Sequence, residues 1–202
     1  LATAQQKKID HILTKIALKP GQKLLDIGCG WGALVIRAAQ HFGAECVGIT
    51  LSAQQQAWAN ERIRLLDLHD QVRIQLLDYR DVAGQYERIT SVGMFEHVGL
   101  KNLPMYFHRL NQLLVNDGLM LNHGICTTNT DHRTARYGAG EFISQYVFPH
   151  GELPHIGTVL RTMQEGGLET LDVENLRRHY ARTCTLWADN FERNDERIRS
   201  LV

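Results

Sequence analysis

The sequence predicts an α/β fold in which helices cover a doubly wound, mostly parallel sheet. Apolar strand-like runs alternate with helical patterns over residues 23–125, which favours parallel strands joined by right-handed crossovers. A turn after the first apolar run has Gly28, Gly30 and Gly32 at alternate positions, preceded by Asp26. Glycine permits positive φ and a close approach to a ligand, and the next helix would direct its N-terminus there. We therefore expect a nucleotide-type pocket above this turn.

Length, composition and charge limit the class of protein to which this chain can belong. The chain has 202 residues and is 44% hydrophobic, which suits one globular domain. Its 22 Lys and Arg residues balance 22 Asp and Glu residues, so the basic surface typical of a nucleic-acid partner is not indicated. Four scattered cysteines without a C-x-x-C pair favour reduced thiols in a cytoplasmic protein. No apolar run reaches the length of a membrane span.

The first half of the chain supplies three strands and three helices. Ala4–Leu18 has apolar residues at helical spacing and ends before a Pro-Gly pair. A second helix is expected over Ala33–Phe42, and Ser52 is a suitable N-cap for a third that runs through Leu66. Buried strands are expected over Lys23–Ile27, Glu45–Thr50 and Val72–Leu77.

The second half extends the sheet. One helix ends at an Asn-Asp-Gly turn and another begins after a proline. The expected elements are a strand over Arg88–Gly93, a helix over Leu103–Val115, a strand over Leu119–Ile125, a helix after Pro154, a strand near Glu169–Val173 and a helix from about Tyr180. Residues 127–150 interrupt the alternation of strands and helices. A segment of this length without a clear strand or helix pattern, inside a domain, more often has a function than none.

Polar residues follow several strands at the edge where ligands bind in such sheets. The second strand ends at Thr50, with Gln55 shortly after it; these hydroxyl and amide groups can bind ribose hydroxyls where an acidic residue is usual. Asp78 ends the third strand, where it could hold an adenine amino group or cap the next turn.

Two further residues are candidates for acid–base chemistry. Glu96 follows the fourth strand beside His97, but further ligands at zinc spacing are missing, so no metal is expected. His123 interrupts an apolar strand at its carboxyl end, and a packed core histidine is the alternative interpretation.

Five motifs occur in order: DIGCGWG at 26–32, GITLS at 48–52 with Gln55, GMFEHVG at 93–99, YVFPHGELP at 146–154 and HYARTCTLW at 179–187. Over nearly the whole chain they resemble the cyclopropane-fatty-acyl-phospholipid synthases and the related mycolic acid methyltransferases. The first motif is shared by many S-adenosylmethionine-dependent methyltransferases, whereas the third and fourth are much more selective. The resemblance implies a class I methyltransferase, Rossmann-like, with a seven-stranded sheet in one domain over residues 1–202 and an α-rich acyl-binding insertion at about 127–150.

The resembled family transfers a methyl group from S-adenosylmethionine to a cis double bond in an acyl chain. An alkene is a weak neutral nucleophile, so the sulfonium supplies the driving force, and loss of a proton from the resulting carbocation closes a cyclopropane ring. The resemblance implies that a bicarbonate ion takes this proton, held by Glu96, His123, Tyr180 and the backbone at Ile125. The cofactor would be bound by Asp26, Gly28, Gly30, Gly32, Thr50, Gln55 and Asp78.

The resemblance also implies a substrate and its setting. Aromatic side chains could line an acyl pocket and stabilise a cation through their π faces, with ordinary core packing as the alternative; they are Tyr137, Phe142, Tyr146 and Phe148. The implied partners are unsaturated phospholipid acyl chains, reached by transient peripheral contact with a membrane, and a homodimer is an open option. Because the family continues beyond both ends of this chain, we expect both termini to be truncated.

Two other functions stay open at this point. A small-molecule amine N-methyltransferase of a related branch would share these motifs, and it predicts little loss on Tyr180→Phe. A non-catalytic S-adenosylmethionine-binding module would have no need of Glu96, His123 and Tyr180 together.

Overall fold

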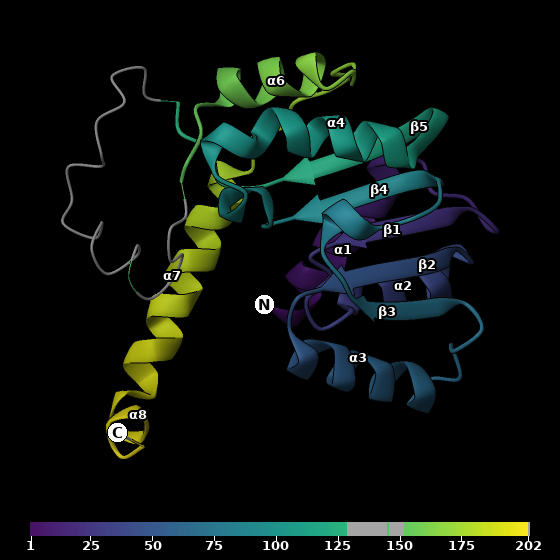
Figure 1. The fold of residues 1–202 in the computed structure, drawn as a ribbon. Coiled ribbons are helices and arrows are strands. Elements are labelled where there is room, and N and C mark those ends of the chain that lie inside the picture. The colour runs from purple at the N-terminus through teal and green to yellow at the C-terminus, as the bar shows by residue number, and fades with distance from the viewer. Residues whose placement is uncertain (129–144, 146–151, 202) are drawn as a thin grey trace.

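The computed structural model describes residues 1–128, 145 and 152–201, and it contains a parallel sheet in the order β3-β2-β1-β4-β5 (Figure 1). All four neighbouring pairs of strands are parallel. The strands are β1 (Lys23–Ile27), β2 (Glu45–Thr50), β3 (Val72–Leu76), β4 (Tyr86–Val92) and β5 (Leu114–His123). The doubly wound α/β class is thus confirmed, whereas the described part of the chain has five strands and does not confirm seven.

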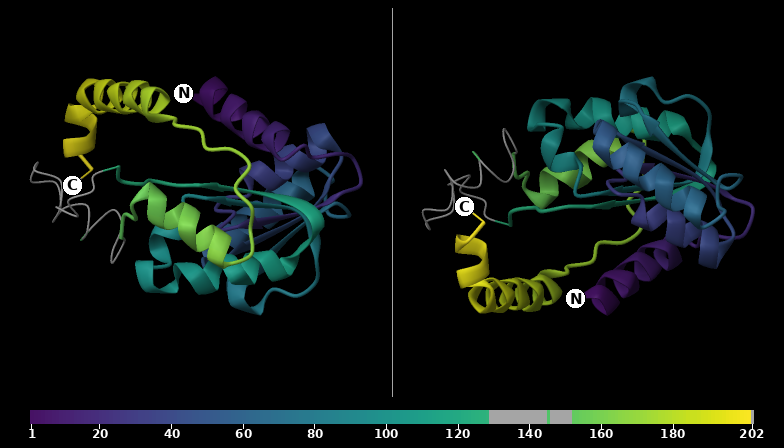
Figure 2. Two further views of the ribbon diagram at one scale, coloured as in Figure 1. Left: turned by 90° about the horizontal axis from the view of Figure 1, so that it is seen from above. Right: turned by 90° about the horizontal axis from the view of Figure 1, so that it is seen from below.

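Helices cover both faces of the sheet, with α1 and α4 on opposite sides (Figure 2). Each face has its own apolar cluster, and β1 contributes Leu24 to one and Leu25 to the other. Burial on both faces explains why β1 is almost continuously apolar. The helices are α1 (Ala2–Lys15), α2 (Ala33–Phe42), α3 (Ala53–Leu65), α4 (Leu103–Leu113) and α6 (Ile156–Glu165), with short 3-10 turns η1 (Tyr79–Asp81), η2 (Phe95–His97) and η3 (Leu100–Asn102).

Two expectations for the second half need correction. The last strand of the sheet starts at Leu114 rather than Leu119, because the Asn-Asp-Gly turn is absorbed as an irregularity in β5 with Asp117 at φ +62°. Residues Glu169–Val173 form no strand. Their segment runs along α1 instead, where Lys15 forms ion pairs with Asp172 and Glu174, and it leaves Leu171 72% exposed.

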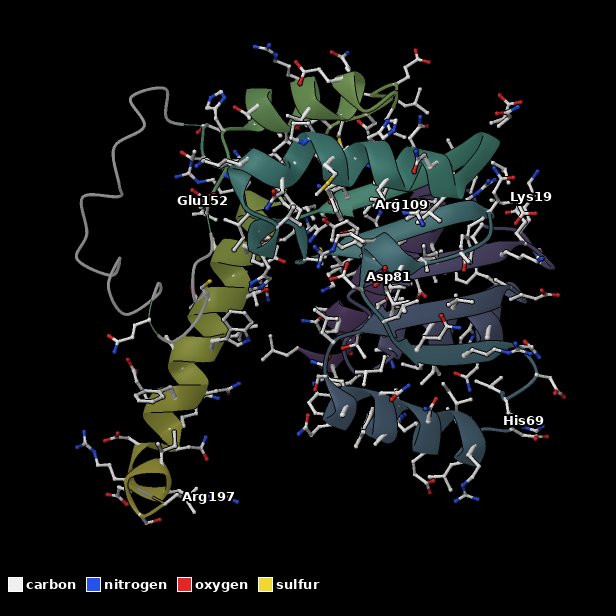
Figure 3. All side chains as sticks on the ribbon, viewed as in Figure 1. Lys19, His69, Asp81, Arg109, Glu152 and Arg197 are labelled. Atoms are coloured by element: carbon white, nitrogen blue, oxygen red, sulfur yellow. The ribbon has the colours of Figure 1, made fainter. Side chains whose placement is uncertain are left out.

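The chain ends in α7 (Arg177–Arg193) and α8 (Asp195–Arg199), which stand apart from the sheet with exposed side chains around them (Figure 3). No residue of either helix is buried. Across the described ranges, no helix combines the length and apolar character needed to cross a membrane.

Candidate active site

The glycine turn has the geometry that its sequence predicts. Gly28, Gly30 and Gly32 take φ angles of +74°, +55° and +80°, a region that favours glycine. The backbone N–H groups of Gly28 and Cys29 both donate to the Ile49 carbonyl, at 3.1 and 2.9 Å, which fixes the turn against β2. A Cβ at Gly30 would meet no atom within 4 Å, so this position borders open space at the start of α2.

Gly48, within β2, packs directly against the glycine turn. A Cβ at Gly48 would lie 2.8 Å from the Cys29 sulfur, so only glycine lets the turn cross the strand this closely. Burial raises the pKa of Cys29 to about 12, which keeps the thiol neutral. Sequence reasoning treated Gly48 only as part of a motif; its place inside an otherwise apolar strand was the available signal.

Asp26 lies in β1, beneath the turn, and is buried. Its Oδ1 accepts a hydrogen bond of 2.7 Å from the Thr90 hydroxyl on the neighbouring strand β4. Burial raises the pKa of Asp26 to about 6, against the opposing effect of that hydrogen bond.

We expect Asp26→Asn to change how stability depends on pH. A folded-state pKa near 6, above the unfolded value of 3.8, means that ionisation of Asp26 opposes folding. The stabilising contribution is therefore full below pH 3.8 and is lost as pH rises through 6. Relative to Asp26→Asn, the wild type should lose roughly 2.4 kcal/mol of unfolding free energy between pH 4 and 7, measured by urea denaturation. Parallel pH profiles for the two proteins would contradict this.

Thr50 and Gln55 lie together at the end of β2, as their spacing predicts. The buried Thr50 hydroxyl donates to Gln55 Oε1 at 2.6 Å and accepts from the Ser52 backbone N–H at 3.2 Å. Ser52 is the N-cap of α3, because its hydroxyl accepts from the Gln55 N–H at 3.3 Å. The predicted cap is confirmed, and the cap places the Gln55 amide beside the strand end.

Asp78 lies two residues beyond the end of β3, which stops at Leu76 rather than Leu77, and it caps η1. Its Oδ1 accepts from the Arg80 backbone N–H at 2.9 Å, and its two carboxylate oxygens also pair with the Arg80 guanidinium. Arg80 lowers the pKa of Asp78, so the group is ionised at neutral pH. Asp78 therefore caps the turn that follows it, which was one of its two interpretations. A contact between Asp78 and an adenine amino group stays a prediction.

The candidate acid–base residues converge from three separate segments. Glu96 in η2 is 2% exposed, and its Oε1 accepts a hydrogen bond of 2.8 Å from the Ile125 N–H just beyond β5. His123 ends β5, and its Nε2 lies 3.4 Å from the Tyr180 hydroxyl in the first turn of α7. The His123 and Tyr180 rings also stack, with centroids 5.9 Å apart. The Ile125 N–H already donates to Glu96, so the Ile125 carbonyl is the backbone group of this residue that could contact a ligand.

Burial sets the protonation of this cluster. It lowers the pKa of His123, assisted by the charge of Lys8, so the imidazole is neutral at neutral pH. It raises the pKa of Tyr180, so the phenol keeps its proton. Two buried atoms, Glu96 Oε2 and His123 Nδ1, have no hydrogen-bond partner among the described residues, and buried polar atoms ordinarily have one.

One residue that sequence reasoning missed brings these segments together. A Cβ at Gly124 would collide with the Phe95 ring and lie 3.0 Å from Glu96 Oε1, so only glycine lets η2 approach the end of β5. A Cβ at Gly28 would lie 3.1 Å from the Met94 side chain, which joins the glycine turn to the segment that carries Glu96. The two parts of the site are therefore neighbours at the carboxyl ends of β1, β4 and β5.

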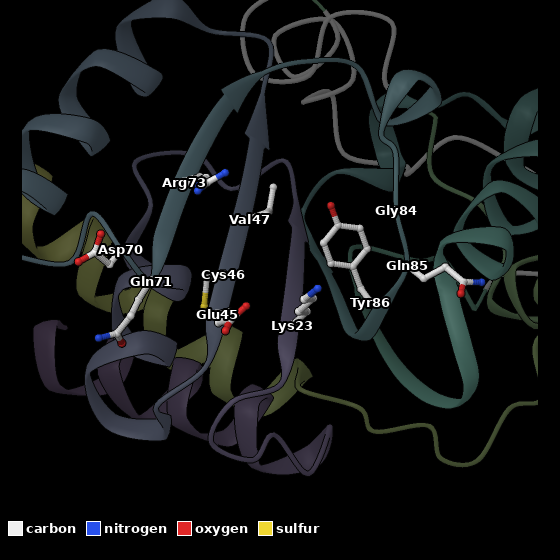
Figure 4. A pocket seen from close by; sticks show the side chains of 10 residues that line it. All are labelled: Lys23, Glu45, Cys46, Val47, Asp70, Gln71, Arg73, Gly84, Gln85 and Tyr86. Carbon is white, nitrogen blue, oxygen red and sulfur yellow. The ribbon is translucent and has the colours of Figure 1, made fainter.

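The expected acyl-pocket residues Tyr137, Phe142, Tyr146 and Phe148 lie outside the described residues. In the described ranges, no three His, Cys, Asp or Glu side chains gather as metal ligands would. All four cysteines are free. A cavity of about 340 Å³ opens at the opposite, amino ends of the strands, between Lys23, Arg73 and Tyr86, and none of the predicted site residues lines it (Figure 4).

Two exposed tryptophans flank the glycine turn. Trp31 in the turn and Trp58 in α3 meet edge to face, with ring centroids 5.6 Å apart, and the Arg62 guanidinium lies over the Trp58 ring. Trp31 is 51% exposed, so the pair forms a wall of the turn rather than part of the core.

Comparisons with known proteins agree with this arrangement. The chain is 46% identical to a probable fatty acid methyltransferase of Pseudomonas putida over its full length, which is 52% of that protein. It is 40% identical to the cyclopropane-fatty-acyl-phospholipid synthase of Escherichia coli, over 95% of this chain and 47% of that one. The structure of the mycolic acid cyclopropane synthase CmaA1 complexed with SAH and CTAB superposes with a TM-score of 0.89 at 31% identity, covering 99% of this chain and 73% of that one.

The chain thus spans about half the length of the curated relatives it matches. The match to the family itself covers every residue from 1 to 202. The chain belongs to the mycolic acid cyclopropane synthetase family.

Proposed function

We propose that this chain is the catalytic part of an S-adenosylmethionine-dependent enzyme that modifies a cis double bond in an unsaturated phospholipid acyl chain and closes a cyclopropane ring. The observation that carries the proposal is the convergence of Glu96, His123 and Tyr180 beside the glycine turn. Cofactor binding alone does not require such a cluster. The names of the relatives, a fatty acid methyltransferase and a phospholipid cyclopropane synthase, support lipid chains as the substrate class.

The glycine turn and the end of β2 would hold the cofactor, which supplies an electrophilic methyl group. Gly30 leaves room for a ligand, and the helix α2 directs its N-terminus toward that space. The Thr50 hydroxyl and the Gln55 amide provide polar contacts at the neighbouring strand end. Asp26 lies behind the turn, where it would place negative charge beneath a cationic ligand when it is ionised.

The acid–base cluster fits a bicarbonate ion, which would supply a base for the departing proton. Glu96 Oε2 is buried and needs a hydrogen-bond donor, and bicarbonate, unlike most small anions, has an O–H group to donate. The Tyr180 hydroxyl and a ring N–H of neutral His123 could donate to its other oxygens. Glu96 would therefore orient the ion by accepting a hydrogen bond from the O–H group of the ion.

The test is transfer of label from S-adenosylmethionine by the full-length protein to bilayers of cis-unsaturated phospholipid, with saturated phospholipid and small amines as parallel acceptors. We expect label only in the unsaturated acyl fraction, and mass spectrometry should find a gain of one CH₂ with loss of the double bond. Label in an amine, or none in the acyl fraction despite cofactor binding, would refute the proposal.

His123→Ala should separate chemistry from cofactor binding. Because the hydrogen-bond and ring contacts of the His123 side chain among the described residues are with Tyr180 and not with the glycine turn, we expect cofactor affinity to stay unchanged while turnover falls by more than about tenfold, as expected for a group that assists proton transfer. Single-turnover kinetics and equilibrium binding measure the two effects. A normal rate would return His123 to the role of a packed histidine.

A further inference from the structure

Helix α7 places Tyr180 beside His123, although no residue of this helix is buried. The two side chains meet through the contact of 3.4 Å between the Tyr180 hydroxyl and His123 Nε2 and through their stacked rings. Burial of an apolar face normally fixes a helix against its neighbours, so the position of α7 needs another source of order. The segment that leads into the helix supplies one.

This segment is bound to α1 by a cluster of ion pairs around Glu174. Glu174 Oε2 lies 2.6 Å from Lys15 Nζ and 2.8 Å from His11 Nε2. Lys15 Nζ also lies 2.5 Å from Asp172 Oδ2. His11 and Lys15 are one turn apart on α1, so two side chains of one helix face converge on a single carboxylate. Lys15, with a smaller effect of His11, lowers the pKa of Glu174 to about 2, so this carboxylate is ionised at neutral pH.

A short path of hydrogen bonds connects Glu174 to Tyr180. The next residue, Asn175, accepts a hydrogen bond of 2.8 Å at its Oδ1 from the Arg177 N–H, where α7 begins. The Leu176 carbonyl then accepts a hydrogen bond of 3.0 Å from the Tyr180 N–H, which closes the first turn of the helix. Because Tyr180 lies in the turn that these residues form, a shift of Glu174 would move the Tyr180 side chain.

We propose that Glu174 is a positioning residue of the active site. Its ion pairs with α1 fix the start of α7, and this keeps the Tyr180 hydroxyl beside His123. The inference rests on the proposed function, in which Tyr180 donates a hydrogen bond to the bound ion. Partly exposed ion pairs contribute little to global stability, so removal of Glu174 should displace one helix rather than unfold the protein.

The experiment compares Glu174→Ala with Lys15→Met, which removes the partner cation, in the full-length protein. Glu169→Ala is the matched control, because Glu169 is an exposed carboxylate of the same segment that lies outside the ion-pair cluster. The first measurement is the NMR spectrum of the His123 ring protons without substrate, since the stacked Tyr180 ring shifts these resonances. Tyr180→Leu supplies the reference spectrum of a His123 that lacks its stacking partner.

The second measurement is a double-mutant cycle on turnover, which combines Glu174→Ala with Tyr180→Phe. If Glu174 acts through the Tyr180 hydroxyl, its removal should cost little once that hydroxyl is absent. A residue that only supports the fold would lower turnover by the same factor in both backgrounds. Urea denaturation of each single variant measures global stability alongside.

We expect Glu174→Ala and Lys15→Met each to lower turnover by about fivefold or more, with cofactor affinity and the urea midpoint unchanged. The His123 resonances should move toward those of Tyr180→Leu in both variants and stay at the wild-type positions in Glu169→Ala. In the Tyr180→Phe background, Glu174→Ala should change turnover by less than about twofold.

Two results would overturn the inference even if the wild type transfers label to lipid. One is an unchanged His123 spectrum in Glu174→Ala, and the other is a pair of turnover losses that multiply in the double variant. A wild type that labels no lipid, but whose His123 resonances move in Glu174→Ala, would refute the proposed function and leave the positioning of Tyr180 by Glu174 standing.

Discussion

Gly30→Val should abolish cofactor binding, with affinity reduced by more than about 100-fold. A Cβ at Gly30 has open space around it, so the branched side chain would occupy the room that a ligand needs at the N-terminus of α2. The φ of +55° adds backbone strain of roughly 1–2 kcal/mol or more for a non-glycine residue. Equilibrium binding of S-adenosylmethionine measures the loss.

Gly21→Val separates the two causes. Gly21 has a φ of +77°, and a Cβ there also meets no atom within 4 Å, but it lies before β1, at the other end of that strand from the turn. We expect a similar loss of stability in both variants by urea denaturation and a loss of affinity only in Gly30→Val. Equal affinities in the two variants would mean that the turn does not hold the cofactor.

Glu96→Gln should lower turnover by about 100-fold or more, the range expected when a group essential to proton transfer is lost. The amide oxygen can still accept from the Ile125 N–H, so the contact between η2 and β5 survives. The unpartnered Oε2 becomes an NH₂ group, which donates where the site requires an acceptor. Cofactor affinity should change little, and turnover with cis-unsaturated phospholipid measures the effect.

The chain offers a matched control in Glu152→Gln. The Glu152 carboxylate also accepts a backbone N–H, from Leu100 at 2.7 Å, and it lies close to the site but is exposed (Figure 3). Turnover near the wild-type level in Glu152→Gln beside a strong loss in Glu96→Gln would assign the effect to the buried oxygen. A fast Glu96→Gln enzyme would remove Glu96 from the reaction.

The central strands were predictable because their residues act locally. β1 and β2 have the boundaries expected from the sequence, since buried apolar runs end there at a glycine turn and at the Ser52 cap. The sheet edge was not predictable in this way. A strand forms only where a partner pairs with it, and the alternating pattern at 169–173 does not reveal that its neighbour is α1 rather than β5.

The candidate site likewise contains some features that local sequence predicts and others that it does not. The grouping of Thr50 with Gln55 followed from the helix cap, and the positions of Glu96 and His123 followed from the strand ends. The close packing at Gly124 depends on segments far apart in the chain, and no local pattern encodes it.

The contact between Trp31 and Trp58 gives the protein a built-in optical signal. The chain has three tryptophans, and the third, Trp187, lies on the exposed face of α7. The fluorescence of an indole ring depends on its surroundings, so a ligand that binds against the glycine turn should change the fluorescence of Trp31 and Trp58. A chain carrying Trp187→Phe would then report the arrival of each ligand directly, without a dye or a coupled assay, and at the time resolution of stopped flow.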